Sequence, residues 1–130
     1  MTGLTVSPED SETVIFGHTV SDLQTDVSIS GGAATGTLHK VTTGALKKDW
    51  GEGYFMVVKF SDLDEDATSI LVGLEPSEGS GLVELINDPD KNAVFKVTDK
   101  VKQKLVVMQR CTGFVKVQRV DLSGLTLSTT

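Results

Sequence analysis

The sequence predicts an all-β protein, an immunoglobulin-like antiparallel β-sandwich that carries an extended N-terminal arm. Thr, Ser, Val and Gly are frequent while aromatic residues make up only 5%, which favours short strands joined by small-residue turns. Roughly eight strand-like segments recur every 8–12 residues, the rhythm of a sandwich or barrel. The sequence shows neither long amphipathic helices nor alternating strands and helices, which argues against a parallel α/β sheet. The Cys…Trp…Cys pattern of antibody domains is absent, since the chain has one cysteine.

The N-terminal region differs from the rest of the chain. Residues 1–33 are rich in Ser, Thr, Asp and Gly, and they contain one compact apolar island, Val14-Ile15-Phe16. Weak alternation at Val27 and Ile29 indicates an edge strand in this region. We therefore predict an extended arm over residues 1–33 and a sandwich domain over residues 34–130, with a partly disordered tail as the alternative for the arm.

The strongest strand signal is the run Tyr54–Phe60. One face of this strand would carry Tyr54, Met56, Val58 and Phe60, and the other would carry Phe55 and Val57. A strand that is apolar on both faces is usually central and covered on both sides, or covered on one side by an oligomer partner. The first face is therefore a candidate oligomer interface.

The other strands of the domain are predicted from apolar runs between turn-forming residues. They are residues 36–42, 69–74, 82–86, 93–97, 104–110 and 114–122, with a last strand around Leu125 and Leu127. Gly113 lies between two of these runs and suits a hairpin turn.

The run 114–122 changes phase along its length. Val115 and Val117 point one way, whereas Val120 and Leu122 have the opposite parity. A β-bulge near Gln118-Arg119 would reconcile the two halves, because the extra residue of a bulge inverts the alternation.

Charge and composition limit the partners. The formal net charge is −6, and the 12 basic residues are scattered, so we expect no nucleic-acid binding, which needs clustered Lys and Arg. We also expect no membrane span, because no apolar run approaches the ~20 residues that a bilayer requires. The N-terminus lacks the basic and apolar regions of a signal peptide, and the lone Cys111 is compatible with a reducing cytoplasm.

Residues that could carry chemistry do not form a known catalytic pattern. They are the acidic turns 62–66 and 88–92, the two histidines His18 and His39, Ser80 and Cys111. The second turn begins with calcium-loop spacing, but Ala93 stands where that loop requires glycine. Metal, cofactor and catalytic residues are therefore not expected, and we expect the protein not to be an enzyme.

Trp50 lies in a polar loop between two predicted strands. An aromatic residue in such a loop is often a surface contact residue. It could equally fold back over the end of the sandwich.

Four stretches of the chain agree in order and spacing with one known family. They are Gly36–Thr42, Gly53–Phe60, Asp90–Lys100 with Gln103 and Lys104, and Asp121–Leu127. With these stretches, the part of the chain after residue 35 resembles the head fibre or auxiliary capsid proteins of tailed phages and prophages.

The resemblance implies a structural virion protein on the outer surface of a capsid. It implies the major capsid protein as partner, a small homo-oligomer (a trimer in preference to a dimer) and synthesis in the host cytoplasm. Val14, Ile15 and Phe16 of the arm would then contact the capsid, or the arm would lie on a neighbouring subunit. No heptad or glycine repeat follows the matching stretches, so we expect a compact knob instead of a long fibre.

Decoration of a capsid would stabilise the shell or aid adhesion to the host. Two other functions are alternatives to it. One is a carbohydrate- or host-surface-binding module displayed on a virion, with Trp50 and Tyr54 as almost the only aromatic candidates for a glycan. A small hydrolase or metal-dependent enzyme would need a polar pocket that these residues do not suggest.

Overall fold

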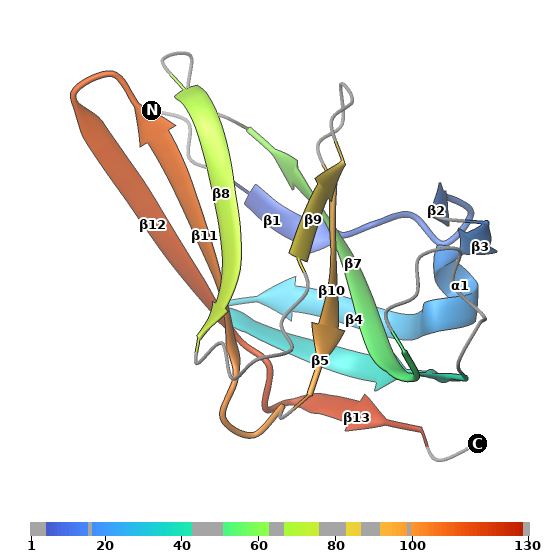
Figure 1. Cartoon of the computed structure of the whole chain (residues 1–130). Helices are drawn as coiled ribbons and strands as arrows, with labels where there is room; N and C mark the ends of the chain where they lie inside the picture. Colours follow the sequence, from blue (N-terminus) through green and yellow to red (C-terminus); the bar gives the residue numbers. More distant parts are fainter. Residues whose placement is uncertain are drawn as a thin grey trace.

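The computed structural model describes residues 5–15, 17–42, 51–62, 67–75, 83–86, 92–98 and 100–128, with 83–86 described by their backbone alone. The described chain is almost entirely strand, with one short helix, α1 (Val20–Leu23), so the all-β class is confirmed (Figure 1). The strands are β1 (Thr5–Pro8), β2 (Val14–Ile15), β3 (His18–Thr19), β4 (Gln24–Ser30), β5 (Ala33–Leu38), β6 (Lys40–Val41), β7 (Gly53–Ser61), β8 (Ala67–Glu75), β9 (Val83–Ile86), β10 (Asn92–Val97), β11 (Lys104–Cys111), β12 (Phe114–Asp121) and β13 (Leu125–Leu127).

These strands form two main sheets and a small hairpin of β2 and β3. The smaller main sheet has the order β1-β7-β10-β9, with β6 also paired to β7. In the larger sheet β5 lies between β4 on one edge and β12 and β13 on the other, followed by β11 and β8. Most pairs are antiparallel, but β5 runs parallel to β13 and to the end of β12, so the larger sheet is mixed and not purely antiparallel.

The two main sheets pack against each other around one apolar core. Alternation along each strand directs every second side chain inward. The smaller sheet contributes Val6, Met56, Val58, Phe60, Ala93, Phe95 and Val97; the larger sheet and its β12–β13 connection contribute Ala34, Leu38, Ile70, Leu74, Leu105, Val107, Val120, Leu122 and Leu125. A sandwich-like arrangement of sheets is therefore present.

The other face of the smaller sheet is covered by the N-terminal segment. Phe55, Val57 and Val94 on that face pack with a second set of buried residues, Ile15, Val20, Leu23 and Val41. Figure 1 shows α1, β2 and β3 together at one side of β7. The chain itself thus covers both apolar faces of β7.

This arrangement corrects the predicted oligomer interface. Met56 and Val58 are fully buried and Phe60 is 4% exposed, all within the core of the same chain. The half-buried Tyr54 packs against that core, and its hydroxyl donates to the carbonyl of Ser128 at 2.8 Å. Because these side chains are already packed, the face they share is not a surface for a partner.

The predicted extended arm is also corrected. Strand β1 pairs antiparallel with β7 from Thr5↔Ser61 to Pro8↔Val58, and β4 pairs with β5 across the predicted boundary at residue 33. The described part of residues 1–33 therefore belongs to both sheets. Its apolar residues Val6, Ile15, Val20 and Leu23 are buried in the two apolar clusters.

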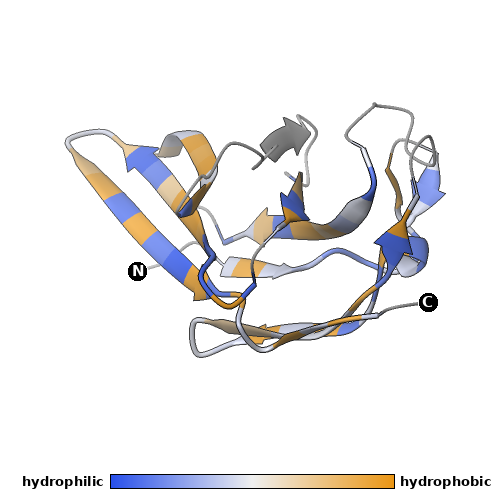
Figure 2. Ribbon diagram, turned by 60° about the horizontal axis from the view of Figure 1, so that its bottom comes forward, coloured by the Kyte–Doolittle hydropathy of each residue, from blue (hydrophilic) through white to orange (hydrophobic). Residues whose placement is uncertain are grey.

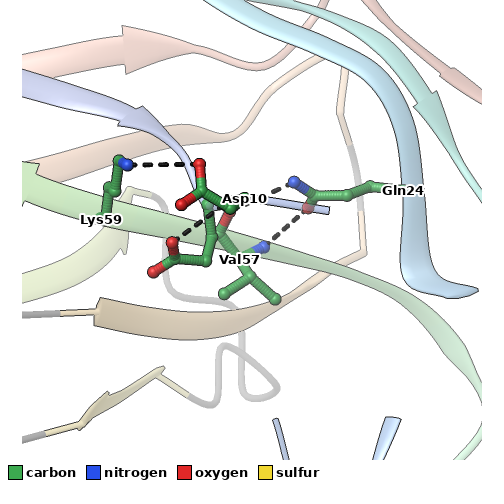
Figure 3. A network of polar contacts seen from close by, with 5 residues as sticks. Asp10, Gln24, Val57 and Lys59 are labelled. Atoms are coloured by element: carbon green, nitrogen blue, oxygen red, sulfur yellow. Dashed lines mark hydrogen bonds and ion pairs between the residues drawn. The ribbon is translucent and has the colours of Figure 1, made fainter. Parts of the chain in front are cut away.

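The buried side chain of Gln24 joins this N-terminal segment to the central strand. Val57 lies on the edge of β7 between the residues paired to β1 and those paired to β6. At this gap, Gln24 Oε1 accepts from the Val57 N–H at 2.8 Å (Figure 3). The Val57 carbonyl accepts both from Gln24 Nε2 at 3.3 Å and from the Glu9 N–H at 3.2 Å. Beside it, Lys59 Nζ lies 3.4 Å from Asp10 Oδ1. The side-chain amide of Gln24 thus makes hydrogen bonds to the β7 backbone that a residue of a neighbouring strand would otherwise make.

Replacing Gln24 with Leu should destabilise the protein by about 1–3 kcal/mol, because the Val57 N–H is left buried without an acceptor. Chemical denaturation monitored by circular dichroism measures the change. Ser28→Ala, which removes only an exposed hydrogen bond to Thr35, is the matched control and should change stability by less than about 0.5 kcal/mol. Equal stability of the two variants would contradict the account.

A bulge in β4 requires glycine at position 36. The register between β4 and β5 shifts between Thr25 and Ser28, where Asp26 has a φ of 55°. This shift brings the β4 backbone close to Gly36, whose φ is 125°. A Cβ on Gly36 would lie 2.5 Å from Val27 Cα and 2.6 Å from the Asp26 carbonyl oxygen, so no other residue fits without moving the backbone.

Gly36→Ala should therefore destabilise the fold by about 3 kcal/mol or more, since it combines backbone overlap with an unfavourable φ. Gly73→Ala is the control, because a Cβ there meets nothing within 4 Å. We expect the control to change stability by less than about 1 kcal/mol in thermal unfolding. A Gly36 variant as stable as the Gly73 variant would show that the bulge is not placed as described.

Candidate docking surface

The outer face of the larger sheet carries exposed apolar side chains that no described part of the chain covers. We call the patch formed by Leu71, Val106, Met108, Val115 and Val117 the outer face. Leu71 and Val115 are 50% exposed and Val117 is 43% exposed, whereas Val106 and Met108 are half-buried. The hydropathic banding of β11 and β12 is visible in the hairpin that projects at the left of Figure 2.

Strand register brings these residues together. Met108 on β11 lies opposite Leu71 on β8 and opposite Val117 on β12, so the three form one row across the strands. The intervening residues Leu105 and Val107 are fully buried on the inner face. Alternation therefore places apolar residues on both faces of this part of the sheet, and only the inner set is covered.

The predicted β-bulge near Gln118-Arg119 is wrong. Strands β11 and β12 pair without a shift from Lys104↔Asp121 to Cys111↔Phe114. Val120 points inward and is buried, while Val115 and Val117 lie on the outer face. The apparent phase change was therefore the sequence signal of an exposed apolar face.

A shallow hollow lies over β8 and β11 on this side of the sheet. Its volume is about 600 Å³, and it is lined by Leu71, Val72, Gly73, Leu74, Glu75, Val106 and Met108. Gly73 lies opposite Val106 and has open space where a side chain would stand. A missing side chain beside apolar neighbours leaves room for an apolar group of a partner.

The charge around the outer face is opposite in sign to that of the whole protein. Strand alternation places Lys104, Arg110 and Arg119 on the outer face against Asp121 and Glu75, a net charge of +1, while the chain as a whole carries −6. Arg119 Nε lies 3.6 Å from Glu75 Oε1, an exposed ion pair that contributes little to stability. An apolar and acidic partner surface would complement this side.

Among the described residues, those that the sequence singled out do not gather into a second site. Val14 is 62% exposed, but Ile15 is buried against the smaller sheet. Phe16 and Trp50 lie outside the described residues, so their predicted contact roles stay predictions. Among the residues that the structure describes, no group of three His, Cys, Asp or Glu side chains could hold a metal ion.

Asp121 ends β12 at the border of the outer face. Its Oδ1 accepts from the Ser123 N–H at 2.9 Å, and this bond, a further bond with the Ser123 side chain and the charge of Lys104 together keep the pKa of the Asp121 carboxyl below its ordinary value of 3.8. The ionised carboxylate thus stabilises the turn from which β13 departs along β5.

Asp121→Asn should lower stability at neutral pH. Because the folded-state pKa lies below the unfolded value, the contribution of the carboxylate is present above pH 3.8 and is lost as the pH falls further. The difference in unfolding free energy between the two proteins should therefore shrink below that pH in urea titrations. A difference that stays constant from neutral to acidic pH would contradict this role.

Comparison with known proteins found no match to this chain among protein-family models, curated proteins or solved structures. Within its described residues, no helix is long and apolar enough to cross a membrane.

Proposed function

We propose that this protein is a structural virion protein that decorates the outer surface of a phage capsid, as head fibre or auxiliary capsid proteins do. It would be made in the host cytoplasm, bind the major capsid protein, act as a small homo-oligomer and stabilise the shell or aid adhesion to the host surface. The resemblance of four stretches to that family is the first support. We also propose that the sandwich is immunoglobulin-like.

The outer face is the observation that carries the binding role. Most of the resembling stretches lie in β7, in β10 and in the β12–β13 connection, which supply core residues such as Met56, Phe95 and Leu125. The resemblance therefore concerns the fold. The attachment surface has to be found elsewhere, and the outer face is an apolar patch set in a basic hairpin, of the kind that marks protein–protein contact.

The second candidate is a module that binds carbohydrate on the host surface. Of its two aromatic candidates, Tyr54 is half-buried with its hydroxyl bonded to Ser128, and Trp50 lies outside the described residues. Binding of a protein partner through the outer face thus has the stronger support, because all residues of the outer face are described by the structure.

The location is tested on phage particles released by cells that carry the gene. Particles purified on a density gradient are labelled with an antibody against the chain and imaged by electron microscopy. We expect label on the outside of capsids. Particles that contain no trace of the chain, by label and by mass spectrometry, would refute the proposed function.

The surface is tested with recombinant chain added to particles that lack it. Val115→Asp combined with Val117→Asp places charge on the outer face and should weaken binding about tenfold or more, as loss of a buried contact does. Val14→Asp is the matched control, since it changes an exposed valine of the N-terminal segment. If only the control variant loses binding, the contact lies on the N-terminal segment instead.

A further inference from the structure

Strand β8 is the last strand of the larger sheet, and β9 of the smaller sheet contacts it without pairing with it. Strand β8 pairs with β11 along its length, and no other strand in the described chain pairs with it. With nine residues, β8 is longer than the ~5–6 residues of a typical strand. An open edge presents a row of backbone donors and acceptors to any chain that can pair with it.

The edge strands β4 and β1 are protected against pairing, whereas β8 is not. Strand β4 is interrupted by its bulge at Asp26, and β1 has four residues and ends in Pro8. Natural edge strands usually carry such bulges, prolines or lysines, which prevent pairing. Strand β8 contains no proline, lysine or arginine, and its only charge is Glu75 at the end.

We propose that two copies of this chain associate by antiparallel pairing of their β8 strands across a two-fold axis at Leu71. In this register Ile70 of each copy lies opposite Val72 of the other, Ser69 opposite Gly73 and Ala67 opposite Glu75. Each copy has a net charge of −6, so the two repel overall, but residues 67–74 carry no charge and no like charges meet in the pairing. The strand is thus complementary to itself.

The pairing also unites the apolar rows of the two copies. The row of Leu71, Met108 and Val117 would continue across the axis into the same row of the second copy, giving one apolar band over six strands. Leu71, now 50% exposed, would pack against its equivalent. Ile70 and Leu74 are already buried in the core, so the pairing does not require the sandwich to open.

At the ends of the pairing, the charged Glu75 of one copy would lie opposite the uncharged Ala67 of the other, so no like charges meet there. The proposal does not depend on the capsid as partner, because it concerns the free chain alone.

The oligomeric state of the free chain is the first test. Sedimentation equilibrium should give twice the 13.9-kDa mass, in a concentration-dependent manner. Leu71→Lys places two like charges at the axis and should weaken the dimer about a hundredfold or more. Val117→Lys, on the same row but two strands away, is the control and should leave the dimer intact.

Disulfide trapping tests the register. In a Cys111→Ser background, Leu71→Cys should cross-link the two copies under mild oxidation, because paired residues in antiparallel strands have Cα atoms within disulfide range. Ser69→Cys, on the same face of the same strand, should not cross-link, since position 69 of each copy would lie opposite Gly73 of the other.

Several results would overturn the pairing. They are a monomer at the highest attainable concentration, a dimer or trimer that Leu71→Lys leaves intact, and cross-linking of the Ser69→Cys variant as fast as that of the Leu71→Cys variant. The capsid-binding tests are separate: loss of capsid binding in Val115→Asp/Val117→Asp with an intact dimer would support both proposals, whereas a dimer that fails to bind any particle would refute only the proposed function.

Discussion

Strand β7 is apolar on both faces, and the rest of the fold follows from the need to cover both. The larger sheet covers the face of Met56 and Val58, and the N-terminal segment covers the face of Phe55 and Val57. The amide of Gln24 closes the edge of the same strand by bonding the Val57 backbone. Without the N-terminal segment, two fully buried side chains and a backbone N–H of β7 would meet water.

This use of the N-terminal segment determines which surface is left for a partner. Since the chain covers both faces of β7 with its own residues, the exposed apolar residues that lie together in the described chain belong to β8 and the β11–β12 hairpin, whereas Val14 and Val101 are exposed elsewhere. That side of the sheet combines exposed valines, a hollow over Gly73 and a positive charge within an acidic protein. A surface of this kind is typical of a binding module and needs no catalytic residue.

Much of the sandwich could be predicted from the sequence, because the strands after residue 35 have regular apolar alternation. The run Tyr54–Phe60 falls within β7, and residues 93–97 fall within β10. Strand β4 lies where the alternation at Val27 and Ile29 predicts an edge strand. Strand β1 could not be predicted in the same way, since it has one buried apolar residue and its pairing with β7 depends on contacts far along the chain. The parallel pairing of β5 with β13 has the same cause, because alternation does not specify a partner strand.

The candidate surface cannot be recognised from the sequence of β12 alone. Apolar residues of both parities fit either a bulge or a regular strand with an exposed apolar face, and β12 is the second. Only the register with β11 distinguishes the two, and a register is a property of two strands together. The role of Gln24 was invisible for a related reason, since a side-chain amide bonded to a backbone 33 residues away leaves no local pattern.

The central claim is that the chain covers β7 itself and offers β8, β11 and β12 to its partner. Amide hydrogen exchange of the free and the particle-bound chain tests it most directly. We predict slow exchange in β7, β1 and β4 in the free chain, unchanged on binding, and new protection confined to the β11–β12 hairpin, since β8 of the free chain is already protected where two copies pair. Fast exchange of β7 in the free chain, with protection that appears only on binding, would contradict the account.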